Sequence, residues 1–153
     1  MADWTNADGL EVRFNGPEAG QTGAGVSTMG AKKQLVLNIS DMATDITAAA
    51  DGFEAFIPAG SFITGAFLVV ESAMTGTTGT LTIGLAEKDG SVIDANGIDD
   101  VIAQADLAAN KAVVCNGALV GGVATVGAAD AYVYTAKGGT VTGGAARLVI
   151  EYV

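Results

Sequence analysis

The sequence predicts an all-β protein, a β-sandwich or jelly roll of about eight short antiparallel strands. Three observations lead to this fold class. Apolar and polar residues alternate with the period of a strand in several short segments. Glycine supplies 22 of the 153 residues and proline only 2, and turn-forming pairs separate the segments. Half of the residues are apolar, so a chain of this length can bury one core without disulfide bonds or metal ions.

The first 33 residues are expected to form a strand followed by a glycine-rich arm. The segment "DGLEVRFN", residues 8–15, alternates apolar and charged residues as a half-buried strand does. Residues 16–33 include five glycines and too few large apolar residues to build a core, which predicts a loop or arm. Residues 34–153 are expected to form a single β-sandwich domain.

Strand signals continue through this domain. The segment "QLVLNIS", residues 34–40, has apolar residues at every second position, and so does "TGTLTIGLAE", residues 78–87. Between them, residues 53–73 are rich in strand-forming residues and are interrupted where Pro58 and Gly60 favour a turn. Further short strands are expected in "VVC", "VATV", "AYVYTA" and "ARLVIEYV".

The stretch "SVIDANGIDD", residues 91–100, leads into the one helix that we predict, over residues 97–106. Asn96 is a suitable N-cap, and the two acids at positions 99 and 100 would lie in the first turn, where the helix dipole favours negative charge. The helical positions i, i+3, i+4 and i+7 are occupied by Ile98, Val101, Ile102 and Ala105. Before this stretch, Asp89 and Gly90 favour a tight turn.

The same stretch is also a candidate calcium loop. The EF-hand spacing fails, because counting from Asp94 puts Ile98 at position 5 and Ala105 at position 12, where oxygen ligands are required. Counting from Asp89 fails as well. A less regular cation site remains as a candidate, formed by Asp89, Asp94 and Asn96.

Charge and residue types argue against several function classes. The formal net charge of −10 should repel nucleic acids and anionic membranes. No apolar run is long enough to span a bilayer, and the first residues lack the features of a secretory signal. The chain has no histidine and a single cysteine, Cys115, so histidine-dependent triads and zinc sites are excluded. We expect folding in a cytoplasm, no cofactor and no enzymatic activity, although a carboxylate-dependent glycosidase stays open in principle.

Four segments carry a resemblance to a known family. "WTNADGLEVRFNGPEAG", "FIPAGSFITGAFLVVESAMTGTTGTLTIGLAEKDGSVIDANGID", "VVCNGALVGG" and "GAARLVIEYV" are similar to small structural proteins of tailed bacteriophages, often of marine and cyanobacterial phages. The resemblance implies a virion component, a capsid decoration (cement) protein of β-sandwich or jelly-roll type without catalytic residues. It also implies the major capsid protein as partner and a homo-oligomer, expected to be a trimer or copies that bridge neighbouring capsomers.

The acidic composition favours the exterior of the capsid, because the interior is packed with phosphate-bearing DNA. We expect assembly in the host cytoplasm and docking of residues 16–33 on the shell, with ordering on binding. The predicted contact residues are Trp4, Lys32 and Lys33, and packing of Trp4 onto its own domain is an equal alternative.

The main alternative function is a head-fibre or tail-fibre adhesin. Such a protein would bind host glycans through loops such as 88–97 and 116–122. Copy number separates the two, because a decoration protein is present in far more copies per virion than an adhesin.

Overall fold

The computed structural model describes residues 4–5, 11–12, 32–47, 56–121 and 124–153. The chain divides into two units at residue 31. In the first unit, β1 (Trp4–Thr5) pairs with β2 (Glu11–Val12) in an antiparallel two-stranded sheet. Strand β2 falls within the strand predicted for residues 8–15, whereas most of the predicted arm lies outside the described residues.

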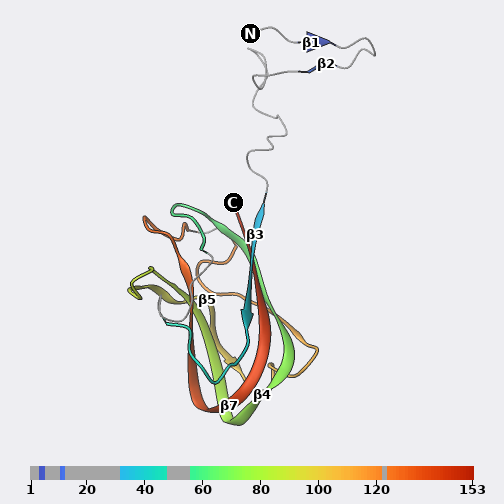
Figure 1. The fold of residues 1–153 in the computed structure, drawn as a ribbon, viewed down its shortest axis with the longest axis vertical. Helices are drawn as coiled ribbons and strands as arrows, with labels where there is room; N and C mark the ends of the chain where they lie inside the picture. The colour runs from blue at the N-terminus through green and yellow to red at the C-terminus, as the bar shows by residue number, and fades with distance from the viewer. Residues whose placement is uncertain (1–3, 6–10, 13–31, 48–55, 122–123) are drawn as a thin grey trace. The chain divides into compact units, whose positions relative to one another are not determined.

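The second unit, residues 32–153, is a five-stranded antiparallel sheet (Figure 1). Its strand order is β3-β7-β4-β5, and β6 also pairs with β4. The strands are β3 (Lys33–Ile39), β4 (Ile63–Ala86), β5 (Val92–Ala103), β6 (Ala112–Val114) and β7 (Tyr132–Tyr152). The described residues contain no helix, and therefore no helix long and apolar enough to cross a membrane. The all-β prediction is confirmed.

Strands β4 and β7 are 24 and 21 residues long, in contrast to the short strands expected. They run side by side and bend back together at the lower end of this unit in Figure 1. Register shifts between Val70 and Thr80 mark the bend in β4. Gly76 and Gly139 adopt φ values of 135° and 67° there, a region that favours glycine. Hydrogen bonds join all five strands in one sheet, so the sandwich or jelly roll stays a prediction.

The core lies on one face of the sheet, as the alternation predicts. Leu37 of β3 pairs with Leu148 of β7, which pairs with Leu68 of β4. Leu68 and Leu148 are fully buried and Leu37 is partly buried against them. The other arm of the bent sheet contributes to the same core with Leu81, Ile83, Leu85, Ile98, Ile102 and Val133.

Both predicted turns form. The N–H of Ser61 donates to the carbonyl oxygen of Pro58 at 3.1 Å, and Gly60 has a φ of 76°. Gly90 has a φ of 90°, and its N–H donates to the carbonyl oxygen of Glu87 at 2.9 Å. The second turn joins β4 to β5, as the glycine position predicts.

The helix predicted over residues 97–106 is wrong, because strand β5 occupies most of this region. Leu81 and Ile83, two residues apart on β4, pair with Ile102 and Asp99, which are three residues apart on β5. Strand β5 therefore has one extra residue at this point, which is a β-bulge.

The apolar spacing that predicted a helix does not exclude a strand. Ile98 and Ile102 are both buried, and a spacing of four residues is even, so a strand as well as a helix can place two such side chains on one side. The bulge puts Asp99 and Ile102, three positions apart, opposite Ile83 and Leu81, and both are buried, whereas Val101 between them adopts a φ of 48° and is 56% exposed. The predicted N-cap, Asn96, is part of β5 instead, and its N–H donates to the Asp94 carboxylate at 3.2 Å.

Candidate interaction surface

The outer face of the sheet formed by β3, β7, β4 and β6 bears a continuous row of apolar side chains. Val36 of β3 pairs with Val149 of β7, Val149 pairs with Phe67 of β4, and Phe67 pairs with Val114 of β6. Directly opposed residues of antiparallel strands point to the same face, so the four side chains form a line across the sheet. We call these four residues the apolar row.

The row is exposed most at its two ends. Val36 is 50% exposed and Val114 is 79% exposed, whereas Val149 between them is only 7% exposed. The exposed apolar area of the row therefore lies at Val36 and Val114, on the two outer strands of this part of the sheet. Apolar area exposed on one face of a sheet is a feature of interaction surfaces.

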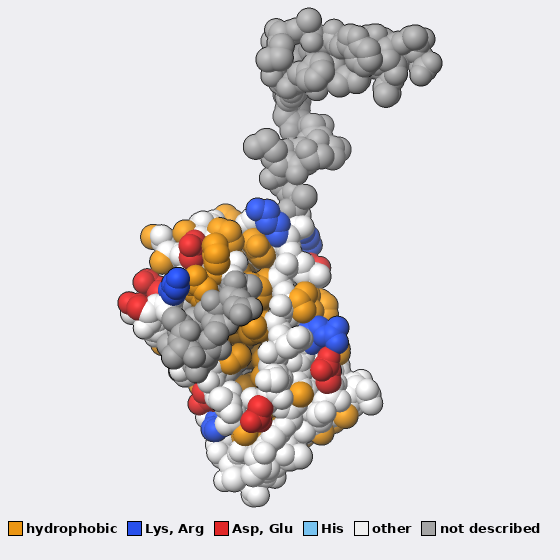
Figure 2. All heavy atoms as spheres, in the orientation of Figure 1, with side chains coloured by type: hydrophobic (Ala, Val, Ile, Leu, Met, Phe, Trp, Pro, Cys, Tyr) orange, Lys and Arg blue, Asp and Glu red, His pale blue; other side chains and the backbone are white. Residues whose placement is uncertain are grey.

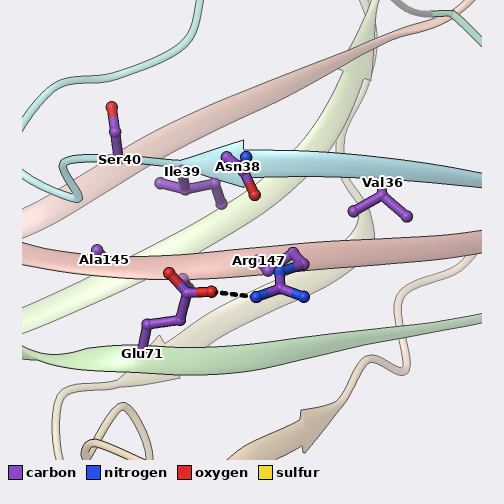
Figure 3. Close-up of a pocket in the computed structure, with 8 residues that line it drawn as sticks. Val36, Asn38, Ile39, Ser40, Glu71, Ala145 and Arg147 are labelled. Carbon is purple, nitrogen blue, oxygen red and sulfur yellow. Dashed lines mark hydrogen bonds and ion pairs between the residues drawn. The ribbon is translucent and has the colours of Figure 1, made fainter.

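Ion pairs lie on both sides of the row. Arg147 of β7 contacts Glu71 of β4 at 2.5 Å, and Lys32 contacts Glu151 of β7 at 3.5 Å. Figure 3 shows the guanidinium of Arg147 directed at the Glu71 carboxylate, with Val36 farther along the same face. All four charged side chains are partly exposed, so each pair contributes little to stability. Together with the row they give an apolar centre with a polar rim, the arrangement found in protein interfaces.

Two hollows open along this surface. The first has a volume of about 600 Å³ and is lined by Val36, Asn38, Ser40, Glu71, Ala145 and Arg147 (Figure 3). The second has a volume of about 400 Å³ and is lined by Thr64, Phe67, Val114, Val120 and Glu151, among others. Figure 2 shows exposed apolar side chains over the upper part of residues 32–153 and an almost uncharged lower end.

The contact residues predicted from the sequence lie in different parts of the chain. Lys32 is in the rim of the apolar row through its pair with Glu151, and Lys33 is exposed at the start of β3. Trp4 lies in β1, in the other unit. Of the three predicted contact residues, Lys32 thus lies in the rim of the apolar row, and none of them belongs to the row itself.

The candidate cation loop is built from local hydrogen bonds. The Asp89 carboxylate accepts from the N–H of Ser91 at 2.9 Å, which together with the Ser91 hydroxyl lowers the pKa of Asp89. The Asp94 carboxylate accepts from the N–H of Asn96. Across the described ranges, no three Asp, Glu, Cys or His side chains are grouped so as to hold a metal ion.

A buried carboxylate and thiol form the most unusual polar contact of the core. Asp99 of β5 is only 6% exposed and accepts hydrogen bonds from the Cys115 thiol and the N–H of Asp100. Burial raises the pKa of Asp99, because it removes water from the charged form. Burial, the Asp99 charge and the hydrogen bond to Asp99 together raise the pKa of Cys115 to about 12. The thiol is therefore protonated and inert at neutral pH.

The two loops considered for glycan binding lie next to each other. The N–H of Gly117 donates to the carbonyl oxygen of Ile98 at 2.8 Å, and the N–H of Leu119 donates to that of Gly97 at 2.9 Å. Residues 92–97 of the predicted loop 88–97 belong to β5, so the loop itself is shorter than predicted.

The fold of this chain recurs in phage capsid structures. A chain of the capsid of Ralstonia phage GP4 matches with a TM-score of 0.54 and 16% identity, over 81% of this chain and 84% of that one. A chain of the cyanophage Pam1 capsid asymmetric unit matches with a TM-score of 0.56 and 18% identity, over 92% of this chain and 96% of that one. Neither a protein-family model nor a curated protein matches the sequence. The chain therefore shares its fold, over most of its length, with chains of two phage capsids.

Proposed function

We propose that the protein is a capsid decoration protein of a tailed bacteriophage, which binds the outer surface of the major capsid protein shell and stabilises it. The observation that carries this proposal is the likeness to capsid chains over 92% of this chain and 96% of the cyanophage chain. Because the coverage is nearly complete in both directions, the shared fold accounts for almost all of each chain.

Charge supports a position on the outside of the shell. The net charge of −10 is unfavourable beside packaged DNA, whereas solvent screens it on the exterior. A protein in this position needs no catalytic group. This fits a chain without histidine and with its one cysteine buried beside Asp99.

The apolar row is the surface that we expect to contact the shell. Covering Val114 and Val36 would remove the two most exposed parts of the row from water, at a gain of about 25 cal/mol for each Å² of apolar area buried. The ion pairs at the rim would stay solvated around this contact. Lys32 in the rim, Lys33 next to it and Trp4 of the N-terminal unit remain the contacts predicted from the sequence.

Co-sedimentation with capsids that lack this protein tests the proposal. The full chain should pellet with the capsids, and Val114→Lys should weaken binding by at least about tenfold, because it would bury a charge in the contact. Val92→Lys is the matched control, since Val92 is 51% exposed on β5, outside the row. Equal binding by all three chains would show that the row is not the contact. A failure of the unaltered chain to bind would overturn the proposed function.

Deleting residues 1–33 tests the arm separately. Capsid binding that is unchanged by this deletion would show that Trp4, Lys32 and Lys33 are not needed for the contact, while the apolar row could still form it.

Counting copies per virion distinguishes a decoration protein from an adhesin. A decoration protein, assembled as the expected trimer or as bridging copies, requires hundreds of copies, while an adhesin requires far fewer.

A further inference from the structure

Among the described residues, strand β3 is an edge strand of the sheet. Among the described residues it pairs only with β7, and its seven residues do so in unbroken register from Lys33 to Ile39. The pairings of β4 with β5 and β7, by contrast, are interrupted by register shifts. The strand contains no proline and no bulge, two devices that proteins use to block an edge. It therefore presents a straight line of N–H and carbonyl groups ready for another strand.

We infer that β3 pairs with β3 of a second copy of this chain, antiparallel and about a two-fold axis that passes beside Val36. The pairing is a property of this chain alone, so it does not depend on the proposed binding to the shell. Two-fold pairing is the commonest symmetry of protein oligomers, and each strand would satisfy the free edge of the other.

The side chains of β3 select this register. With Val36 opposite its own counterpart, Gln34 lies opposite Asn38, so apolar meets apolar and amide meets amide on the outer face. If the two-fold axis passed beside Gln34 or Asn38 instead, Val36 would lie opposite Lys32 or Ser40 of the second copy. On the inner face, Leu35 would lie opposite Leu37, which is still only partly buried in the single chain.

Charge at the two ends of the strand is complementary in the same register. Lys32 and Lys33 precede the strand centre, and Asp41 follows it. Antiparallel pairing about Val36 puts Lys32 opposite Ser40, beside the Asp41 of the other copy. The basic start of each strand therefore meets the acidic end of its partner, in a chain whose net charge otherwise opposes self-association.

The geometry extends the surface described above. A two-fold axis between antiparallel edge strands stands perpendicular to the sheet, so both copies present their outer faces on the same side. The two apolar rows then join end to end at Val36. A dimer of this kind offers one continuous surface, twice as long as that of a single chain, which suits copies that bridge neighbouring subunits.

Disulfide crosslinking of the full chain tests the pairing directly. Directly opposed residues of antiparallel strands have Cα atoms about 4.5–5.5 Å apart, within the range that a disulfide spans. Val36→Cys should therefore give a covalent dimer on oxidation, seen on a non-reducing gel. Val92→Cys, equally exposed on β5, should stay monomeric and controls for random collision. The native Cys115 is buried and supplies no background.

The register has its own test. Gln34→Cys alone and Asn38→Cys alone should not crosslink, because the identical positions would be about 13 Å apart along the strand. A mixture of the two should give a dimer. Thermal melting of each reduced variant checks that it is folded. A Val36→Cys chain that is folded yet stays monomeric would overturn the inference. So would crosslinking of Val92→Cys to the same extent.

Discussion

Gly76 of β4 lies so close to Thr140 of β7 that a Cβ atom on Gly76 would stand 1.9 Å from the Thr140 carbonyl oxygen. This contact lies where the two long strands bend together and the sheet turns back on itself. Because both strands bend here, the two arms of the sheet contribute to one buried core. The close approach of the two backbones is thus a condition for the fold.

Replacing Gly76 with alanine should destabilise the protein strongly. The φ of 135° alone makes alanine unfavourable, by about 1–3 kcal/mol, and the clash with Thr140 adds to this because backbone cannot move aside cheaply. Gly127→Ala is the matched control, since Gly127 has a φ of 110° but open space around it. Chemical denaturation should show that Gly76→Ala lowers the free energy of unfolding more than Gly127→Ala does. Equal decreases would mean that the close approach of the two backbones is unimportant.

Replacing Leu68 with alanine should show how much a buried side chain of β4 contributes to the free energy of unfolding. Leu68 is fully buried and pairs with Leu148, so Leu68→Ala should lower the free energy of unfolding by about 2–5 kcal/mol. Val69→Ala, the next residue on the outer face, should cost much less because Val69 is only partly buried. Urea denaturation of both variants measures the difference. A reversed order would contradict the assignment of inner and outer faces.

Replacing Asp99 with asparagine should change how stability depends on pH. Burial raises the pKa of Asp99 in the folded state above its unfolded value of 3.8, so its ionisation destabilises the fold as pH rises through the folded pKa. Asparagine cannot ionise but can still accept from the Cys115 thiol. The melting temperature of Asp99→Asn relative to the unaltered chain should therefore rise between pH 4 and pH 7.

The Cys115 thiol should be unreactive in the folded protein. Its pKa of about 12 leaves almost no thiolate at pH 8, and its side chain is buried. A thiol reagent should modify the urea-unfolded chain fully while the native chain stays unmodified. In a Val114→Cys variant the added thiol, at a position that is 79% exposed, should react at once. Rapid modification of native Cys115 would contradict its burial beside Asp99.

Much of the fold follows from the sequence because alternation is a local signal. Strand periodicity at residues 34–40 and 78–87 predicted parts of β3 and β4, and the glycine positions predicted two turns. Alternation failed at β5, because the spacing of Ile98 and Ile102 suits a helix as well as a strand, and because a bulge breaks the regular alternation between Asp99 and Ile102. The length of β4 was also missed, because its threonine- and glycine-rich middle has the composition of a turn although it forms a bent strand.

The apolar row was not predicted, for a different reason. Its four residues come from segments far apart in the chain, and each of them is one apolar residue in an ordinary strand pattern. Only the register of β3, β7, β4 and β6 places them in one line. Register depends on long-range pairing, which a single sequence does not specify. Lys32 was found because paired basic residues stand out in an acidic chain.

A density map of the virion that resolves side chains tests the central claim most directly. We expect this chain in many copies on the outside of the shell, with Phe67 and Val114 of the apolar row against the major capsid protein. A shell without this chain, or copies whose apolar row faces solvent, would overturn the proposed function.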